Sequence, residues 1–249
     1  PAPKEGGDLR FTSLHLENWK NFLQANVELR KRVFIVGPNA SGKSNLLDAF
    51  RFLRDVADPQ GGFQRAVRLR GGASQIRSLH ARRYPNVAVE VGIDLDDSAV
   101  WSYRLEFSQD NQRRPIVKKE LVKKNNRVVM ERPDNEDTKD DALLSQTHLE
   151  QVSRNKDFRG IAEFLSSVRY QHIVPQLIRE PDRSIGRVRD PFGGDFLEQL
   201  ASTPTKTLTS RLKRIALALQ IAVPQLEDLK LERDVKGVPH LRGLYKHWR

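Results

Sequence analysis

The sequence predicts an α/β fold that joins a strand–loop–helix unit near the N-terminus to an antiparallel β-meander. Two patterns predict it. An apolar run ends at a glycine-rich loop and leads into helical spacing, and a later series of alternating segments is separated by turn residues. The chain has 249 residues, of which 38% are hydrophobic and 30% charged. This suits one sizeable domain or two small ones with a real core.

Two short strands are expected at the start of the chain. Residues 1–8 are polar and predict a disordered tail with no signal peptide. Residues 9–16 alternate as a strand does, 18–22 form a turn, and 25–29 form the second strand. Residues 32–36 (RVFIV) are β-branched and aromatic, so we expect a buried strand that ends at the glycine-rich loop.

A helix is expected directly after that loop. Apolar residues recur at helical spacing over 44–56, and the helix must stop before Pro59 and the glycine pair that follows it. Residues 60–85 hold two Gly-Gly pairs and many arginines, which indicates loops around a short helix. We therefore place a first lobe at 9–85.

Two alternating segments, and two more that flank an asparagine turn, predict an antiparallel meander at 86–132 with one face toward solvent. A turn is expected at 96–98 and another at Asn125 and Asn126, because asparagine tolerates positive φ. The four expected strands are 87–95, 100–107, 116–122 and 127–131.

The remainder, 133–249, is expected to be helical and mixed. It opens with an acidic segment, 133–141, which we expect to be mobile. The later elements expected in order are a helix at 158–168, an extended piece at 169–174, a long loop at 179–194, helices at 195–201 and 205–221, and a closing hairpin of 225–233 and 238–245.

The glycine-rich loop fulfils the pattern G-x-x-x-x-G-K-[ST] in full, between the expected strand and helix. Glycines let backbone N–H groups curl around phosphate oxygens, and the helix adds its positive N-terminal end. Lys43 is expected to reach the β- and γ-phosphates of ATP, and the Ser44 hydroxyl to hold Mg²⁺. A glycine-rich turn that binds nothing would not need these two residues at these positions. The loop residues are Gly37, Pro38, Asn39, Ala40, Ser41, Gly42, Lys43 and Ser44.

Composition narrows the function classes further. There is no cysteine, which excludes disulfides, thiolate zinc sites and thiol catalysis. No apolar stretch approaches the length of a membrane span, so we expect a cytoplasmic protein with no membrane contact.

Lys and Arg number 43 against 32 Asp and Glu, a formal net charge of +11 that favours nucleic acid as a partner. A solvated basic surface remains the alternative. Contact would be independent of base sequence and would use Lys118, Lys119, Lys123, Lys124 and Arg127.

A wider window around the loop resembles a known family. It comprises LRFTSLHLENWKNF, a short strand, VFIVGPNASGKSNLLDAFRFL and the later segment LRGGASQIRSL. The chain resembles the N-terminal lobe of the SMC/RecF class of ABC-type ATPase heads. It looks closest to the RecF-like and OLD-type ATPases of bacterial DNA maintenance and anti-phage defence. The likeness is good over 9–57, loose from 60 to about 175, and vague afterwards.

The resemblance implies roles for residues outside the loop. Lys20, Asn21 and Asn45 would lie near the nucleotide phosphates. Arg70 or Arg77 would lie in an arginine-bearing loop that touches nucleotide or DNA. A glutamine after the meander, Gln171 or Gln176, would place Mg²⁺ and the attacking water, beside the catalytic Lys43. Ordinary surface roles for these arginines and glutamines remain open.

Two motifs of that class are missing from the sequence. The acidic motif is an apolar run that ends in Asp-Glu. Its nearest candidate, 91–96, alternates and belongs to a half-exposed strand, so we reject it. The signature segment is also missing, since Gly193 and Gly194 lack a preceding serine. Neither His172 nor His240 follows an acidic motif as the switch histidine would. We therefore expect the N-terminal part of a head whose catalytic lobe lies elsewhere in a longer chain or in a partner.

The expected function is ATP–Mg²⁺ binding that drives head dimerisation, a homodimer or larger assembly, and couples it to DNA or an effector protein. The chain alone should hydrolyse ATP barely or not at all, because phosphoryl transfer needs the missing groups. Two alternatives stay open: an ATP-responsive scaffold that does not hydrolyse ATP, and a P-loop kinase. The long meander argues against the kinase.

Overall fold

The computed structural model describes residues 9–79, 81, 86–95, 99–179 and 190–246. It divides into two compact units, Pro1–Val168 and Arg169–Arg249. The expected tail at 1–8 and the turn at 96–98 lie outside the described residues, as does most of the expected loop at 179–194. Within the described residues, no helix combines the length and apolar character needed to cross a membrane.

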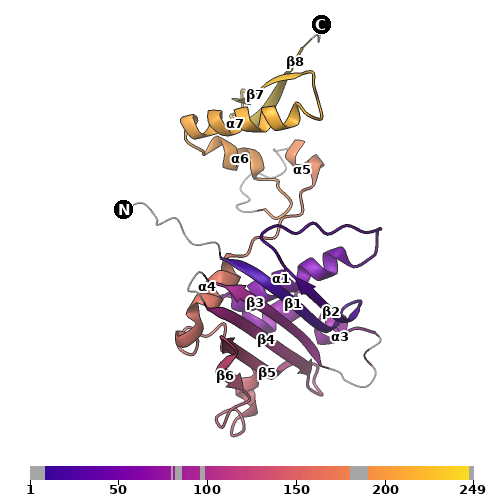
Figure 1. Cartoon of the computed structure of the whole chain (residues 1–249), viewed down its shortest axis with the longest axis vertical. Helices are drawn as coiled ribbons and strands as arrows, with labels where there is room; N and C mark the ends of the chain where they lie inside the picture. Colours follow the sequence, from indigo (N-terminus) through magenta and orange to yellow (C-terminus); the bar gives the residue numbers. More distant parts are fainter. Residues whose placement is uncertain (1–8, 80, 82–85, 96–98, 180–189, 247–249) are drawn as a thin grey trace. The chain divides into compact units, whose positions relative to one another are not determined.

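A six-stranded antiparallel sheet forms the centre of the first unit (Figure 1). Its spatial order is β2-β1-β3-β4-β5-β6, and every neighbouring pair is antiparallel. The expected meander is therefore continuous with the N-terminal hairpin, because β3 pairs along the length of β1. The strands are β1 (Arg10–Trp19), β2 (Phe22–Glu28), β3 (Val87–Asp94), β4 (Val100–Gln109), β5 (Pro115–Lys124) and β6 (Arg127–Arg132).

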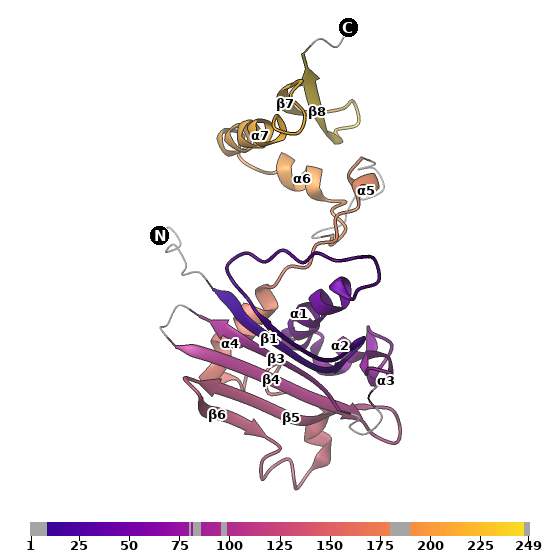
Figure 2. The ribbon, with the colours of Figure 1, turned by 45° about the vertical axis from the view of Figure 1, so that its right-hand side comes forward.

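Helices cover one face of this sheet (Figures 1 and 2). Aromatic rings join the layers: Phe52 of the first helix lies 5.3 Å from both Trp19 and Phe107, and Phe63 lies 5.4 Å from Phe107. All four rings are fully buried, which fixes the first helix against β1 and β4. The helices are α1 (Lys43–Ala57), α2 (Gly62–Arg68), α3 (Ala73–Ile76) and α4 (Arg159–Ser167), with 3-10 turns η1 (Asp141–Ser145) and η2 (Lys156–Phe158).

The other face of the sheet carries charged side chains. Arg104 of β4 forms salt bridges with Glu17, Glu90 and Glu106, which lie on β1, β3 and β4. The alternation in the sequence predicted one polar face, and this network confirms it.

The prediction of a buried strand at 32–36 is wrong for this structure. The segment has no regular secondary structure, and Phe34 and Val36 are 87% and 91% exposed. A strand needs a neighbour for its backbone hydrogen bonds, and no strand among the described residues pairs with it. The segment has the apolar composition of a buried strand, but composition alone does not supply the neighbouring strand that its backbone would need.

The prediction of a mobile acidic segment at 133–141 is also wrong. Asp137 is 1% exposed, and its carboxylate accepts a hydrogen bond of 2.9 Å from Nε of Arg132, which is buried as well. Burial opposes ionisation of this carboxyl, but the bond from Arg132 holds the pKa of Asp137 below its usual value. The same guanidinium also bonds Glu120, so the segment is anchored to β5.

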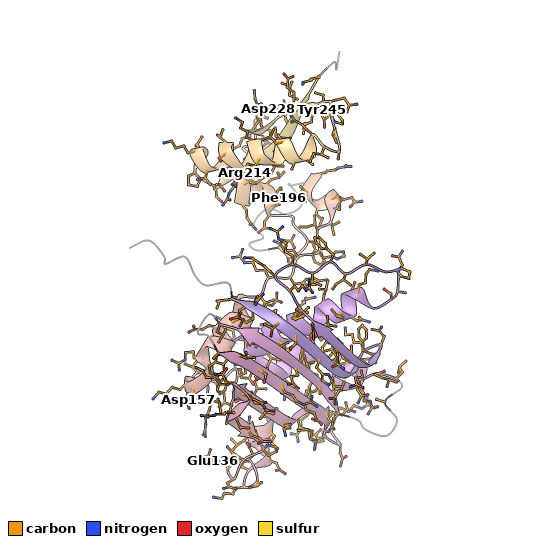
Figure 3. All side chains as sticks on the ribbon, viewed as in Figure 1. Glu136, Asp157, Phe196, Arg214, Asp228 and Tyr245 are labelled. Atoms are coloured by element: carbon orange, nitrogen blue, oxygen red, sulfur yellow. The ribbon has the colours of Figure 1, made fainter. Side chains whose placement is uncertain are left out.

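The described residues of the second unit form two short helices, a longer helix and a hairpin. Ala216, Leu226 and Leu229 form its buried apolar cluster. The hairpin confirms the expectation for 225–245. The elements are α5 (Pro175–Arg179), α6 (Phe196–Ala201), α7 (Thr205–Leu219), β7 (Leu226–Arg233) and β8 (Pro239–Tyr245). Figure 3 labels one side chain on each of the last four: Phe196, Arg214, Asp228 and Tyr245.

Candidate nucleotide-binding site

The glycine-rich loop ends at the N-terminus of α1 in an open cradle. Gly42 caps the helix with φ 95°, and Ala40 also has a left-handed φ of 65°. No side chain caps the helix, and its first turn contains no acidic residue. The N–H groups and positive end of α1 are thus directed at the loop without a built-in anion, as a phosphate-binding helix requires.

Glycine is required at position 42 by geometry. Its φ of 95° is one that other residues rarely adopt, and a Cβ there would meet Asn21 Nδ2 at 2.3 Å. The side chain of Asn21 therefore lies against the loop backbone.

Lys43 closes over the loop from the first turn of α1. Its Nζ donates to the carbonyl oxygens of Gly37 and Pro38, at 2.8 and 2.7 Å. Two neutral carbonyl oxygens are weaker partners for an ammonium group than phosphate oxygens are. An incoming triphosphate can therefore replace them. Ser44 follows in the same helical turn, where its hydroxyl suits a Mg²⁺ ligand.

The turn between β1 and β2 supports α1 from the side. Asn21 Oδ1 accepts a hydrogen bond of 2.8 Å from Asn45 Nδ2, and Trp19 Nε1 donates to the Asn45 carbonyl at 2.7 Å. Lys20 Nζ lies 2.9 Å from the Asp48 carboxylate, also on α1. The structure thus brings Lys20, Asn21 and Asn45 beside the loop, and their contact with a nucleotide stays a prediction.

Arg70 is not part of an open arginine loop in this structure. Its side chain is 6% exposed and bonds both carboxylate oxygens of Asp48, at 3.0 and 2.9 Å, and Asp55 at 3.0 Å. The guanidinium also lies 5.2 Å from the centre of the Phe52 ring. Burial raises the pKa of Asp48, but the bonds from Arg70 and Lys20 outweigh it and lower the pKa overall. Arg70 therefore fastens α1 to the loop after α2, and we call this group the α1 clamp.

The α1 clamp was not predicted from the sequence, although the spacing of two aspartates on α1 points to it. Asp48 and Asp55 are seven residues apart and so lie on the same face of α1, one above the other. Two carboxylates on a helix face that is otherwise covered require a buried cation.

Gln171 and Gln176 both belong to the second unit, and both are exposed. Gln171 lies in an irregular segment and Gln176 in α5. Their role at the nucleotide stays a prediction.

The basic residues of β5 and β6 are partly engaged within the sheet. Lys119 pairs with Glu131 at 2.8 Å, and the Lys124 ammonium lies 4.6 Å from the Trp101 ring centre. Lys118 and Arg127 are exposed, and Lys123 is half-buried. Their contact with nucleic acid stays a prediction.

The candidates for the missing motifs are structural residues. Asp94 pairs with Arg10 on an antiparallel strand, and Asp96 lies outside the described residues. Gly193 and Asp195 lead into α6, with Asp195 buried. His240 contacts Asp234 at 3.2 Å. Among the described residues there is also no group of three or more His, Cys, Asp or Glu residues that could hold a metal ion.

The sequence matches a family model and a curated relative. A family model described as "AAA domain, putative AbiEii toxin, Type IV TA system" matches residues 32–243. The chain is 34% identical over 98 residues to the DNA replication and repair protein RecF of Synechocystis sp. (strain ATCC 27184 / PCC 6803 / Kazusa). That alignment covers 39% of this chain and 25% of RecF, so the chain matches about a quarter of that relative's length.

Two solved structures are also similar. One is the recombination mediator protein RecF with ATP, with 14% identity and a TM-score of 0.35, covering 88% of this chain and 44% of that one. The other comes from work on ATP-driven dimerisation and DNA-stimulated activation of SMC ATPases, with 15% identity and a TM-score of 0.35, covering 84% and 97%.

Proposed function

The chain belongs to the family described as "AAA domain, putative AbiEii toxin, Type IV TA system". We propose that it is a RecF/SMC-like ABC-type ATPase head, which binds ATP–Mg²⁺ and couples this binding to DNA or an effector protein. One observation carries the proposal: the loop at 37–44 forms an open cradle at the uncapped N-terminus of α1. The family assignment confirms the resemblance found in the sequence.

Each loop residue has a physical task in this proposal. The backbone N–H groups around Gly42 and the dipole of α1 attract the phosphate oxygens. Lys43 gives up its two carbonyl partners and pairs with the β- and γ-phosphates. The Ser44 hydroxyl would hold Mg²⁺, which supplies charge neutralisation between the phosphates. Lys20 and Asn21 approach from the β1–β2 turn and keep the cradle in shape.

Hydrolysis needs a further lobe in this proposal. The segment 32–36 offers an unpaired, exposed apolar stretch directly before the cradle. We propose that a strand carrying the acidic motif pairs with it, from another segment or another chain, and brings a carboxylate to the Mg²⁺ and water. Until that strand is supplied, the chain binds nucleotide and turns it over very slowly.

Assembly and cellular role rest on the relatives. RecF is by its name a protein of DNA replication and repair, and the family model is described as a putative toxin of a toxin–antitoxin system. We propose that ATP draws two heads together in a homodimer, in DNA maintenance or anti-phage defence. A scaffold that binds ATP without hydrolysis is the second candidate, favoured by the missing acidic motif.

The proposal of nucleotide-driven assembly is tested by analytical ultracentrifugation with ATP–Mg²⁺, ADP–Mg²⁺ and no nucleotide. We expect association with ATP that Lys43→Ala abolishes, while Lys118→Ala, an exposed lysine outside the cradle, keeps it. Measured phosphate release separates the two candidates, because the scaffold assembles with none. Identical sedimentation in all three conditions would contradict assembly by ATP.

A further inference from the structure

A second polar cleft lies in the first unit, away from the glycine-rich loop. It has a volume of about 360 Å³ and is formed between α3 and the turn that joins β4 to β5. Ser74 and Arg77 line it from one side, and Gln109, Asn111 and Arg113 from the other. Its lining therefore supplies hydroxyl, amide and guanidinium donors, with no aromatic side chain among the residues that form it.

The two arginines of this cleft have no carboxylate partner within the described part of the chain. This separates them from Arg70, Arg104 and Arg132, which are enclosed by acidic side chains. Arg77 is half-buried and Arg113 is exposed. A guanidinium that is partly removed from water and lacks an anion gains most from a ligand that supplies one.

The one acidic residue of the cleft, Asp110, is already satisfied. Its carboxylate accepts hydrogen bonds from the backbone N–H groups of Gln112 and Arg114, both at 2.8 Å, and from Arg114 Nε at 2.7 Å. The bonds from Arg114 hold the pKa of Asp110 below its usual range. Because Arg114 balances this charge, the cleft as a whole keeps the positive charge of Arg77 and Arg113.

Backbone structure holds both arginines in position. Arg77 follows α3, donates its N–H to the Ala73 carbonyl at 2.9 Å, and bridges to the backbone of Trp19. Arg113 has a left-handed φ of 64°, and its N–H donates to the Asp110 carbonyl at 3.0 Å. The two side chains thus extend from backbone positions that are fixed on the two sides of the cleft, so an anion has to order only the side chains.

We infer that this cleft binds the phosphodiester backbone of a nucleic acid, with Arg77 and Arg113 each contacting a phosphate. Serine and amide side chains complete the phosphate contacts, and the lining has no aromatic ring on which a base could stack. A net charge of +11 favours a long polyanion over a single phosphate. The inference rests on the DNA-binding part of the proposed function and names its surface.

The cleft shares a neighbour with the nucleotide cradle. The Lys20 N–H donates to the Ile76 carbonyl at 2.6 Å, directly before Arg77, while the Trp19 indole bonds Asn45 in the first turn of α1. A single β-turn therefore touches both the cleft and the helix that carries Lys43. A nucleic acid bound at Arg77 is therefore connected through this turn to the helix that carries Lys43.

The test is fluorescence anisotropy with a labelled DNA duplex of arbitrary sequence, at several NaCl concentrations. The variant is Arg77→Gln with Arg113→Asn, since asparagine tolerates a left-handed φ. We expect at least a tenfold loss of affinity, and a slope of log K against log salt that is smaller by about 2, one for each lost phosphate contact. The matched control is Arg154→Gln, which removes one positive charge from an exposed pair with Glu136 and should change affinity less than twofold.

Additional measurements separate a loss of DNA binding from unfolding and from a loss of nucleotide binding. Thermal melting and ATP–Mg²⁺ binding should be unchanged in the double variant, which shows that it is folded. If the double variant melts early, Arg77→Lys alone serves instead, and it should retain part of the affinity. Lys43→Ala should bind DNA like the parent, so a failure of the nucleotide site does not affect this test. Equal DNA affinity of parent and double variant, or no DNA binding by the parent at low salt, overturns the inference. So does a loss of ATP binding alone in the double variant, because the cleft would then be a nucleotide site.

Discussion

Removing Arg70 should destabilise the first unit strongly, because the α1 clamp is buried. The Arg70 side chain is 6% exposed, while those of Asp48 and Asp55 are 16% and 13% exposed. Arg70→Met removes the buried cation that pairs with the carboxylates of Asp48 and Asp55 on α1. Breaking a buried ion pair from one side costs about 3–5 kcal/mol, through the charge left without a partner.

The lower end of that range applies here. Lys20 still pairs with Asp48, and Arg54 still bonds Asp55 at 2.7 Å, so neither carboxylate is left entirely alone. We expect a loss of about 3 kcal/mol, which for a chain of this size lowers the melting temperature by roughly 6–12 °C. Urea titration followed by tryptophan fluorescence measures it, since Trp19 packs on Phe52 within the same core.

Two further variants make the reasoning refutable. Arg65→Met removes an exposed pair with Asp58, at 3.8 Å, and should change stability by less than about 0.5 kcal/mol. Adding Asp48→Asn and Asp55→Asn to Arg70→Met should restore part of the loss, because the stranded charges disappear. The explanation by buried charge is refuted if Arg70→Met costs no more than Arg65→Met, or if the added asparagines restore nothing.

Three more predictions follow from single positions. Gly42→Ala should weaken ATP–Mg²⁺ binding at least tenfold in calorimetry, because φ is 95° and the new Cβ meets Asn21; unchanged affinity would contradict this geometry. Burial, aided by the charge of Arg132, lowers the pKa of His148 from 6.5 to about 4. The unfolded chain therefore binds this proton first, and stability should fall as the pH drops from 6.5 toward 4. His148→Asn should flatten that part of the urea-titration profile, and an equally steep profile would exclude His148 as its source. Phe34→Ser should leave the melting temperature within about 2 °C, because the side chain is 87% exposed, whereas a large loss would show that 32–36 is already paired.

Local patterns in the sequence predicted most of the secondary structure. The segments at 87–94 and 100–109 alternate between apolar and polar residues in the sequence, and both form strands. Along most of β4 the exposure of the side chains alternates in the same way, because successive residues of a strand point to opposite faces. Asn125 and Asn126 have φ of 48° and 64°, as their residue type indicated. Helix α1 begins within one residue of the expected position, since the glycine-rich loop and apolar spacing define it locally.

Predictions that needed a distant partner failed. The run at 32–36 has the composition of a buried strand, but composition does not say which strand will cover it. The acidic segment at 133–141 suggested mobility, because the buried Arg132 that pairs with Asp137 is not evident from charge counts. The resemblance implied that Arg70 or Arg77 would touch nucleotide or DNA. Arg70 instead binds Asp48 and Asp55, which are 22 and 15 positions away, so no local pattern in the sequence joins them.

The candidate site could likewise be predicted where a local motif defines it, but not where residues distant in the sequence meet. The motif at 37–44 defined the loop, and the structure adds Asn21 against Gly42, which the resemblance had suggested near the phosphates. The cleft of Arg77 and Arg113 combines residues 36 positions apart and could not be located without the sheet. Its existence depends on the β4–β5 turn returning beside α3.

The most direct test of the central claim is calorimetry of ATP–Mg²⁺ binding to the parent chain and to Lys43→Ala. We expect one site per chain for the parent, and a loss of affinity of at least tenfold in the variant, with both proteins melting at the same temperature. Equal binding by the two would place the nucleotide elsewhere than the loop at 37–44. No binding by the parent would contradict a cradle that is already formed in this chain.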